Sequence, residues 1–170
     1  MNPQPTIRPA RPDDLPALAG IERRAAALFA PEDLPPALRG ETVPEPTLRQ
    51  AQADGLLWVA EDGGRLAGFA LAEWLDGRLH LAEMDVDPDH GRRGVGAALL
   101  AHAVEQAARL GCDAVTLTTF DHLPWNAPFY RRHGFADIAP PPASSLAARL
   151  RAEAEAGLAR RVALRRGIVR

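Results

Sequence analysis

The chain has 170 residues, of which 46% are hydrophobic and 25% charged, an ordinary composition for one globular domain. It carries 20 basic and 22 acidic residues, a formal net charge of −2, so the molecule as a whole lacks the basic character of a nucleic-acid-binding protein. No apolar run approaches the roughly 18 residues of a membrane-spanning helix. Residues 1–12 show no secretory signal, and the single cysteine, Cys112, has no partner for an internal disulfide. We therefore expect a cytoplasmic protein that binds neither nucleic acid nor membrane.

The charge is unevenly distributed. Residues 143–170 carry seven arginines and two acidic residues, whereas the remainder of the chain is acidic. All 20 basic residues are arginine, so no lysine can form a Schiff base, hold phosphate in a P-loop or act as a general base. The basic C-terminal segment could contact an anionic ligand, but a solvent-exposed amphipathic helix explains it as well.

The first part of the chain predicts a short extended segment at residues 6–9 and then a helix. Asp13 or Asp14 can cap this helix. Apolar residues recur in it every three or four positions: Leu15, Leu18, Ile21, Ala25 and Leu28. Five prolines between residues 31 and 46 predict loop or isolated turns, and a brief helix is expected over residues 47–53.

Three strands are expected next, over residues 56–61, 66–73 and 79–86. Turn signals of the Asp-Gly type separate them. A helix with one apolar face, which includes Leu110, then begins at Val95 and ends near a glycine in the position of a C-cap.

The last part of the chain again alternates between strand and helix patterns. Strands are expected over residues 114–119, 135–138 and 162–169, and helices over residues 127–133 and 146–158. This order predicts an α/β fold with a mixed sheet and helices on both faces.

The most informative segment joins the strand at residues 79–86 to the long helix. It holds three glycines within six residues, Gly91, Gly94 and Gly96, beside Arg92 and Arg93. Glycines let the backbone approach a ligand, and the first turn of a helix presents unpaired N–H groups that favour negative charge. The segment predicts a diphosphate-binding turn, with a plain loop before a helix as the alternative. The missing lysine excludes a P-loop, and a position after several strands excludes a Rossmann turn.

Residues 86–100 resemble the acyl-CoA pyrophosphate motif of the GNAT N-acetyltransferase superfamily, Q/R-x-x-G-x-G/A. Gly94-Val95-Gly96 matches the core of that motif, whereas Gly91 stands at its Q/R position. Residues 126–135 resemble the later superfamily motif, Asn…Phe/Leu-Tyr-x-x-x-Gly-Phe. The two motifs follow each other in the expected order, with one helix, one strand and a short loop between them.

The resemblance implies a single acyltransferase domain over residues 1–170, with a core at about 6–138 and a C-terminal helix and strand at about 143–170. It implies a splayed mixed sheet that binds acetyl-CoA and transfers the acetyl group to an amine of a small molecule or peptide, without a metal. The residues that it places at the cofactor are Met84, Val86, Gly91, Arg92, Arg93, Gly94, Val95, Gly96, Ala97 and Asn126. A non-catalytic acyl-CoA-binding sensor or assembly module on the same fold is the alternative function.

Tyr130 is the catalytic acid that the resemblance implies. It is the only tyrosine, and a phenol with a pKa of about 10 is protonated at neutral pH and can protonate the departing thiolate. Packing as a core aromatic is the alternative. For the base, the resemblance points to His80, because an ordinary imidazole titrates near neutrality, or to Glu83 acting through water. Either residue could instead be a satisfied polar group of a half-buried strand.

The acceptor side is less specific. Glu22 and Glu73 could line an amine pocket, and acidic residues such as Asp85 would suit a cationic small molecule or a peptide amino terminus. Surface positions explain these acids as well. The identity of the acceptor and the formation of a homodimer stay open.

Overall fold

The computed structural model describes residues 3–169 of the chain. Its strands are β1 (Thr6–Pro9), β2 (Leu57–Asp62), β3 (Arg65–Leu75), β4 (Arg78–Val86), β5 (Ala114–Phe120), β6 (Ala136–Ile138) and β7 (Arg161–Gly167). Its α-helices are α1 (Leu15–Ala26), α2 (Pro36–Arg39), α3 (Glu45–Ala53), α4 (Val95–Arg109), α5 (Ala127–Arg132) and α6 (Ser145–Glu155). The predicted strands and helices are thus present, with ends shifted by at most three residues, and α2 lies inside the segment predicted to be loop or turns.

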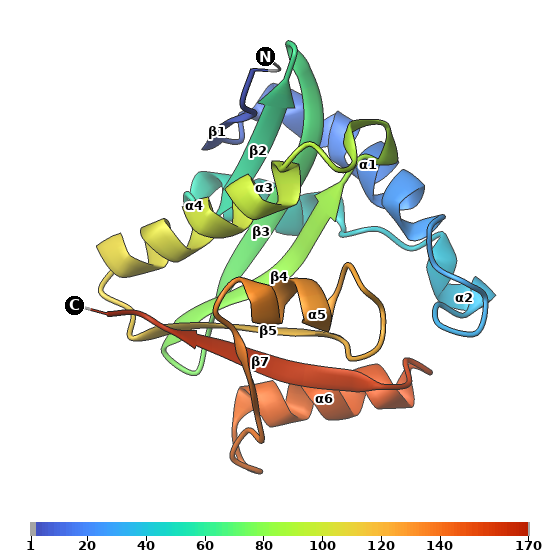
Figure 1. Cartoon of the computed structure of the whole chain (residues 1–170), viewed down its shortest axis with the longest axis vertical. Coiled ribbons are helices and arrows are strands. Elements are labelled where there is room, and N and C mark those ends of the chain that lie inside the picture. Colours follow the sequence, from blue (N-terminus) through green and yellow to red (C-terminus); the bar gives the residue numbers. More distant parts are fainter. Residues whose placement is uncertain (1–2, 170) are drawn as a thin grey trace. The chain divides into compact units, whose positions relative to one another are not determined.

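The seven strands follow the order β1-β2-β3-β4-β5-β7-β6 in one sheet (Figure 1). The described chain divides into two compact units. The N-terminal unit comprises residues 3–73 and 82–103, and the C-terminal unit comprises residues 74–81 and 104–169. The chain passes from one unit to the other within β3, within β4 and within α4. Between residues 3 and 169, no helix has both the length and the apolar character that a membrane span requires.

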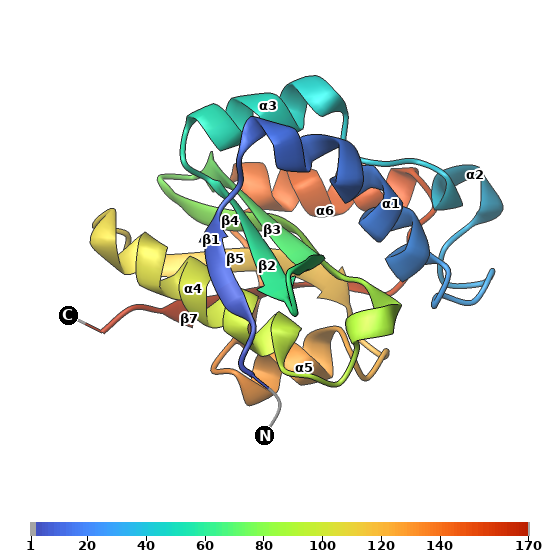
Figure 2. The same cartoon turned by 90° about the horizontal axis from the view of Figure 1, so that it is seen from above.

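In the N-terminal unit, β1, β2 and β3 pair in antiparallel fashion. Helices α1 and α3 lie on one face of these strands, and the first part of α4 lies on the other (Figure 2). The core between α1, α3 and the strands consists of aliphatic and aromatic side chains that are almost wholly buried. They include Leu15, Leu18, Ile21, Leu48, Leu57, Val59, Phe69 and Leu71.

Two details of the predicted helices are wrong. Leu28 and Leu110, expected on apolar faces, are 56% and 50% exposed because α1 ends at Ala26 and α4 at Arg109. The carboxylate of Asp14 does not cap α1: it accepts hydrogen bonds from the Arg8 guanidinium and the Arg11 amide instead. A 3-10 turn at Pro12–Asp14 directly precedes α1, so the chain is already helical before the first residue of α1.

In the C-terminal unit, the first part of β4 runs parallel to β5, with Leu79 opposite Val115 and His80 opposite Thr116. Strand β7 pairs antiparallel with both β5 and β6. Helices α5 and α6 lie on opposite faces of the β5–β7 pair (Figures 1 and 2). The start of α6 is anchored by Asp76, whose carboxylate accepts hydrogen bonds from the first two amides of the helix.

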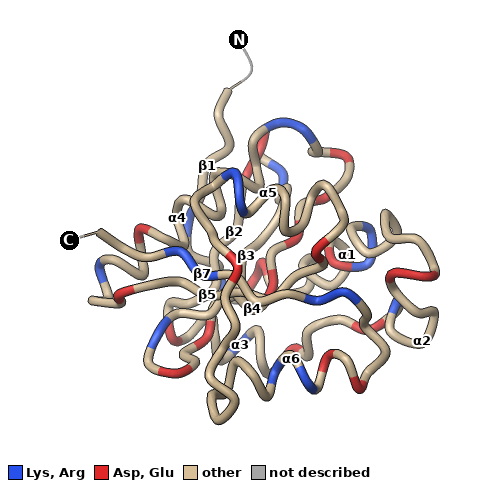
Figure 3. Tube along the Cα trace, turned by 60° about the horizontal axis from the view of Figure 1, so that its bottom comes forward, with Lys and Arg blue, Asp and Glu red and all other residues tan. Residues whose placement is uncertain are grey.

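The basic C-terminal segment is largely engaged within its own unit. Blocks of basic and acidic residues follow each other along α6 (Figure 3). Arg161 pairs with Glu153 of α6 at 3.1 Å and lies 4.6 Å from the centroid of the Phe120 ring. Arg166 donates a hydrogen bond to the carbonyl of His133. Arg161 and Arg166 therefore attach β7 to the neighbouring elements. This structural role explains both arginines without a bound anion.

Gly68 provides a test of the packing between β3 and β4. A Cβ atom there would lie 2.6 Å from the carbonyl oxygen of Asp85 and 3.3 Å from Cδ1 of Leu99. Glycine in a strand interior commonly marks such a close approach of another backbone. We expect Gly68→Ala to lower the free energy of unfolding by about 1–3 kcal/mol, the usual cost of overpacking.

The matched control is Gly40→Ala, at a position with φ −90° and open space around the added methyl group. This change should alter stability by about 0.5 kcal/mol or less. Urea unfolding of both variants measures the difference, and equal midpoints would contradict the packing described for Gly68.

Candidate functional site

The glycine turn between β4 and α4 adopts a backbone that places several amides at the start of a long helix. Arg92 has φ +60° and Gly94 has φ +79°, both in the left-handed region. The first hydrogen bond of α4 joins the Ala98 amide to the Gly94 carbonyl, so the amides of Val95, Gly96 and Ala97 precede the helical ladder. Together with the helix dipole, amides in this arrangement favour an anionic group.

The turn is anchored by the carboxylate of Asp62 at the end of β2. Nδ1 of His90 and Nε of Arg93 each lie 3.0 Å from Oδ2 of Asp62, whose side chain is only 4% exposed. Arg93 is therefore tied to the protein, whereas Arg92 is exposed. The sequence did not reveal this role of Asp62, because an Asp-Gly-Gly triplet is equally typical of a plain hairpin turn.

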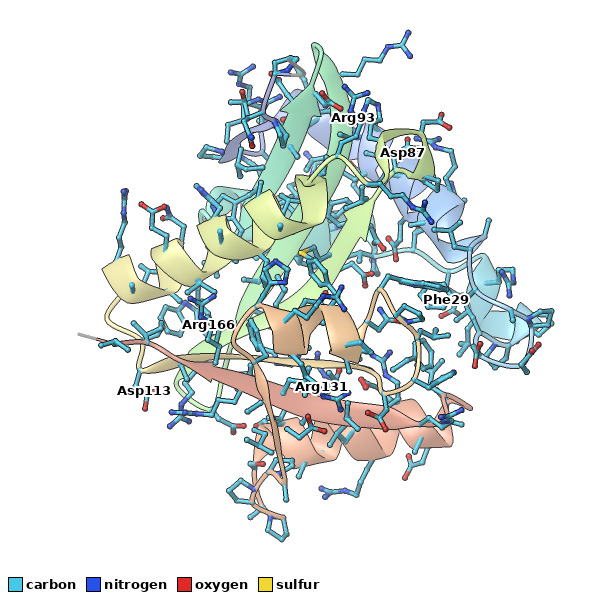
Figure 4. The ribbon with its side chains drawn as sticks, in the orientation of Figure 1. Phe29, Asp87, Arg93, Asp113, Arg131 and Arg166 are labelled. Atoms are coloured by element: carbon cyan, nitrogen blue, oxygen red, sulfur yellow. The ribbon has the colours of Figure 1, made fainter. Side chains whose placement is uncertain are left out.

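A second carboxylate fixes the other end of the turn. Arg24 of α1 donates two hydrogen bonds to Oδ2 of Asp87, at 2.7 and 3.0 Å. Burial opposes ionisation of Asp87, but the hydrogen bonds from Arg24 and from the Asp89 amide outweigh it and hold its pKa below the usual range. Figure 4 shows Asp87 and Arg93 at this turn.

Three carboxyl groups gather in the N-terminal unit: Glu22 of α1, and Glu83 and Asp85 of β4. One oxygen from each lies within 4.8 Å of the other two. Glu83 and Asp85 share a face of the strand, as strand alternation predicts. Their association with Glu22 depends on how α1 packs, which no local pattern in the sequence shows. Oxygen ligands in this arrangement can hold a cation.

The carboxyl cluster, by which we mean Glu22, Glu83 and Asp85, has unusual proton affinities. Burial raises the pKa of Glu22 to about 7, and the charge of Glu83 adds to this effect. Burial also raises the pKa of Asp85 well above its usual range, with the charge and hydrogen bond of Glu83 and the charge of Glu22 acting in the same direction. The amide of Val43 donates to Glu22 Oε1 at 2.9 Å and partly opposes the shift of that residue.

His80 lies in the C-terminal unit, so the two candidate bases belong to different units. The imidazole is 1% exposed, and its Nδ1 lies 3.0 Å from Oγ1 of Thr116. Burial lowers the pKa of His80 to about 4, with the charge of Arg149 adding to the shift and that of Asp76 opposing it. The ring is therefore neutral at pH 7 and a weaker base than an ordinary histidine.

Tyr130 lies in α5, where its side chain is almost wholly buried. Its ring makes edge-to-face contacts with Phe129 and Phe135 at centroid distances of 5.2 and 5.9 Å. The helix is fixed by Arg131, which pairs with Asp121 before it and with Asp137 after it, at 2.6 and 2.8 Å (Figure 4). The tyrosine is therefore both a packing residue and rigidly placed.

Asn126 stands at the N-cap of α5, and its backbone carbonyl accepts a hydrogen bond from the Tyr130 amide. Its side-chain Oδ1 is buried without a hydrogen-bond partner among residues 3–169. A buried acceptor of this kind is costly unless another group supplies a donor. Asn126, Tyr130 and His80 thus all belong to the C-terminal unit. The glycine turn and the carboxyl cluster belong to the N-terminal unit.

Comparison with known proteins identifies a family. The profile of the acetyltransferase (GNAT) family matches residues 26–135. Mycothiol acetyltransferase of Clavibacter michiganensis subsp. michiganensis is 42% identical over 86 residues, which are 49% of this chain and 28% of that protein. The chain therefore spans little more than a quarter of that relative. Ribosomal protein bS18-alanine N-acetyltransferase of Escherichia coli (strain K12) is 28% identical over 138 residues, which are 75% of this chain and 85% of that protein.

Solved structures show the same fold. PaiA N-acetyltransferase from Thermoplasma acidophilum, in complex with coenzyme A, superposes with a TM-score of 0.72 at 16% identity, over 98% of this chain and 100% of that chain. The ribosomal-protein-S18-alanine N-acetyltransferase from Escherichia coli gives a TM-score of 0.69 at 22% identity, over 98% and 96% of the two chains. These structures confirm the predicted mixed α/β fold, and the family profile covers more than half of the sequence. The chain belongs to the acetyltransferase (GNAT) family.

Proposed function

We propose that this chain is an N-acetyltransferase that transfers the acetyl group of acetyl-CoA to an amine. The observation that carries the proposal is the glycine turn, whose amides stand at the start of α4 in a member of this family. In this proposal the two units act together as one acyltransferase domain in the cytoplasm, without a metal or a nucleic-acid partner. The buried single cysteine and the engaged C-terminal arginines are consistent with it.

The diphosphate of acetyl-CoA is proposed to bind the amides from Arg92 to Ala97, with the exposed Arg92 side chain as a neighbouring cation. The amide of Gly91 is not among them, because it donates to the carbonyl of Pro88 at 3.1 Å. Arg93 contributes indirectly, because its pairing with Asp62 shapes the turn. The backbone of Met84 and Val86 is proposed to pair with the pantetheine arm. Oδ1 of Asn126 fits a role as acceptor for an amide N–H of that arm, since it is buried and no described residue donates a hydrogen bond to it.

The chemistry requires a deprotonated amine, a polarised thioester carbonyl and a proton for the thiolate. The amine nitrogen attacks the thioester carbon, the carbon–sulfur bond breaks, and Tyr130 donates its hydroxyl proton to the departing sulfur. The amine proton passes to Glu83, directly or through one water. We favour Glu83 over His80, because Glu83 lies beside Glu22 and Asp85 in the carboxyl cluster, whereas burial lowers the pKa of the His80 imidazole to about 4 and makes it a weak base.

The acceptor does not follow from the relatives. One is named for mycothiol and another for an alanine of a ribosomal protein, so members of this family differ in the amine that they modify. A non-catalytic acyl-CoA-binding module is the competing function. Release of free thiol from acetyl-CoA in the presence of an amine separates the two, because only an enzyme produces it catalytically.

The glycine turn is tested by Gly96→Asp. The change adds a side chain and a negative charge within the first turn of α4, where the diphosphate is proposed to bind. We expect no measurable acetyl-CoA binding by calorimetry. Gly40→Asp adds the same charge at an open site remote in sequence and should bind like the wild type. Equal affinity for Gly96→Asp and the wild type would refute the assignment of the turn.

The proposed acid is tested by Tyr130→Phe, which keeps the ring and its aromatic contacts. Loss of a general acid typically lowers turnover by about a hundredfold or more. We expect that decrease in kcat, with acetyl-CoA affinity and thermal stability unchanged. A variant with wild-type kcat on a verified acceptor would leave Tyr130 with a packing role alone.

The base is tested by pH–rate profiles. A carboxyl base must be ionised, so kcat/KM should rise with pH as the base in the carboxyl cluster loses its proton and should then level off. His80→Gln should keep this rise in place, since His80 titrates near pH 4. Glu83→Gln should lower or displace it. The opposite pattern, with the rise lost only in His80→Gln, would assign the base to His80.

A further inference from the structure

The proposed catalytic acid stands on a helix that is too short to hold its own orientation. Helix α5 has six residues, and isolated helices shorter than about 12 residues are marginal in water. Tyr130 and Arg131 are neighbours on this helix, so their side chains leave it about 100° apart. The tyrosine is buried, whereas the arginine side chain is 35% exposed. Contacts of the arginine can therefore set the direction in which the tyrosine points.

Arg131 makes a forked contact on the outer side of α5. Its Nε and Nη2 atoms each donate a hydrogen bond of 2.8 Å to a different oxygen of the Asp137 carboxylate. Nη2 also donates to Oδ1 of Asp121 at 2.6 Å. Two parallel bonds of this kind fix the plane of a guanidinium. Most exposed ion pairs matter little, but a forked arginine shared by two carboxylates is an arrangement in which they do matter.

Both carboxylates belong to segments that the sheet holds in place. Asp121 directly follows β5, and its amide donates a hydrogen bond to the carbonyl of Arg160 at 2.8 Å. Asp137 lies in β6, opposite Leu164 of β7. The hydrogen bond from Arg131 lowers the pKa of Asp137 and outweighs the opposing effect of burial, so this carboxylate is ionised at neutral pH. Arg131 thereby links α5 to the end of β5 and to β6.

The position of the tyrosine hydroxyl is sensitive to a small rotation of α5. A hydroxyl about 8 Å from a helix axis moves by about 1.4 Å when the helix turns by about 10°. A misplacement of about 1 Å can slow a reaction by about a hundredfold. The ring contact between Tyr130 and Phe129 does not prevent such a rotation, because both residues belong to α5 and move together.

We infer that Arg131 is a positioning residue for the catalytic acid: its forked contact with Asp137 and its bond to Asp121 hold α5 at the rotation that directs Tyr130 toward the thioester sulfur. This inference rests on the proposed acetyl transfer and adds to it a residue that acts only through Tyr130. Loss of Arg131 should therefore displace the phenol and lower kcat, and it should leave the affinity for acetyl-CoA nearly unchanged.

The first test follows the phenol itself by NMR. Tyr130 is the only tyrosine, so isotopic labelling of tyrosine Cζ in the full chain gives one signal. Saturating coenzyme A, whose thiol the phenol is proposed to meet, should shift this signal in the wild type. The shift should be at least about twofold smaller in Arg131→Gln, because the displaced phenol meets the thiol less closely. Arg132→Gln, which removes the next and exposed arginine of α5, should keep the full shift.

Equal shifts in Arg131→Gln and the wild type would overturn the inference. A wild-type signal that does not move when coenzyme A binds would refute Tyr130 as the acid, and the inference would fail with it.

A double-mutant cycle separates positioning from general support of the fold. With an amine that releases thiol from acetyl-CoA in the wild-type assay, Arg131→Gln should lower kcat by about tenfold or more and change KM for acetyl-CoA by less than about twofold. In the Tyr130→Phe background the same change should cause no further loss, because the hydroxyl that Arg131 positions is already absent. An equal fold-loss in both backgrounds would overturn the inference.

The matched variants also control for folding. Arg131→Lys keeps the charge without the fork and should recover only part of kcat. Melting temperatures should stay within about 3 °C of the wild type, since the ion pairs are partly exposed. If Arg131→Gln does not fold, Asp137→Asn weakens the forked contact and replaces it in both tests, with the same expectations.

Calorimetry with acetyl-CoA on the same samples distinguishes this inference from the proposed function. If the wild type does not bind acetyl-CoA, the proposed function itself fails. If the wild type binds it and Tyr130→Phe loses turnover while Arg131→Gln does not, the inference alone fails and acetyl transfer stands.

Discussion

The arrangement of the glycine turn depends on the buried carboxylate of Asp62. This one group meets both His90 and Arg93, at 3.0 Å each, and thereby fixes the loop that leads from β4 into α4. The ion pair between Arg24 and Asp87 fixes the preceding residues to α1. Asp62 and Arg24, which hold the two ends of the turn, lie outside it. The backbone amides at the start of α4 therefore stay available for a ligand. A ligand that meets such a preformed site loses less free energy to ordering the loop.

The close approach at Gly68 belongs to the same construction. Only a residue without a Cβ lets β3 come this near to the carbonyl of Asp85, in the strand segment that also carries Glu83. The backbone spacing of two strands thus bears directly on where the acidic side chains stand. The close contact at Gly68 therefore affects both the packing of the two strands and the position of the acidic side chains on β4.

The carboxyl cluster illustrates a different relation between stability and function. The folded state raises the pKa of Glu22 to about 7, above its value in an unfolded chain. Its contribution to stability is therefore fully present below the unfolded pKa and is lost as the pH rises through about 7. The fold thus keeps carboxyl groups where burial and a neighbouring charge oppose their ionisation, an arrangement that is common where residues are placed for binding or catalysis. His80 is the contrasting case, since burial beside Thr116 keeps it neutral and makes it compatible with the core.

The sequence by itself determined the order of strands and helices, the glycine turn and the position of Tyr130, because each of these depends on residues close together in the chain. It could not place Glu22 beside Glu83 and Asp85, reveal Asp62 as an anchor, or show that burial lowers the pKa of His80 to about 4. The residues in these contacts stand far apart in the sequence: 28 positions separate Asp62 from His90, and 36 separate His80 from Thr116. Periodicity and local motifs carry no information about such pairs. Tertiary packing alone decides which charged groups meet, how deeply they are buried and therefore which of them hold a proton at neutral pH.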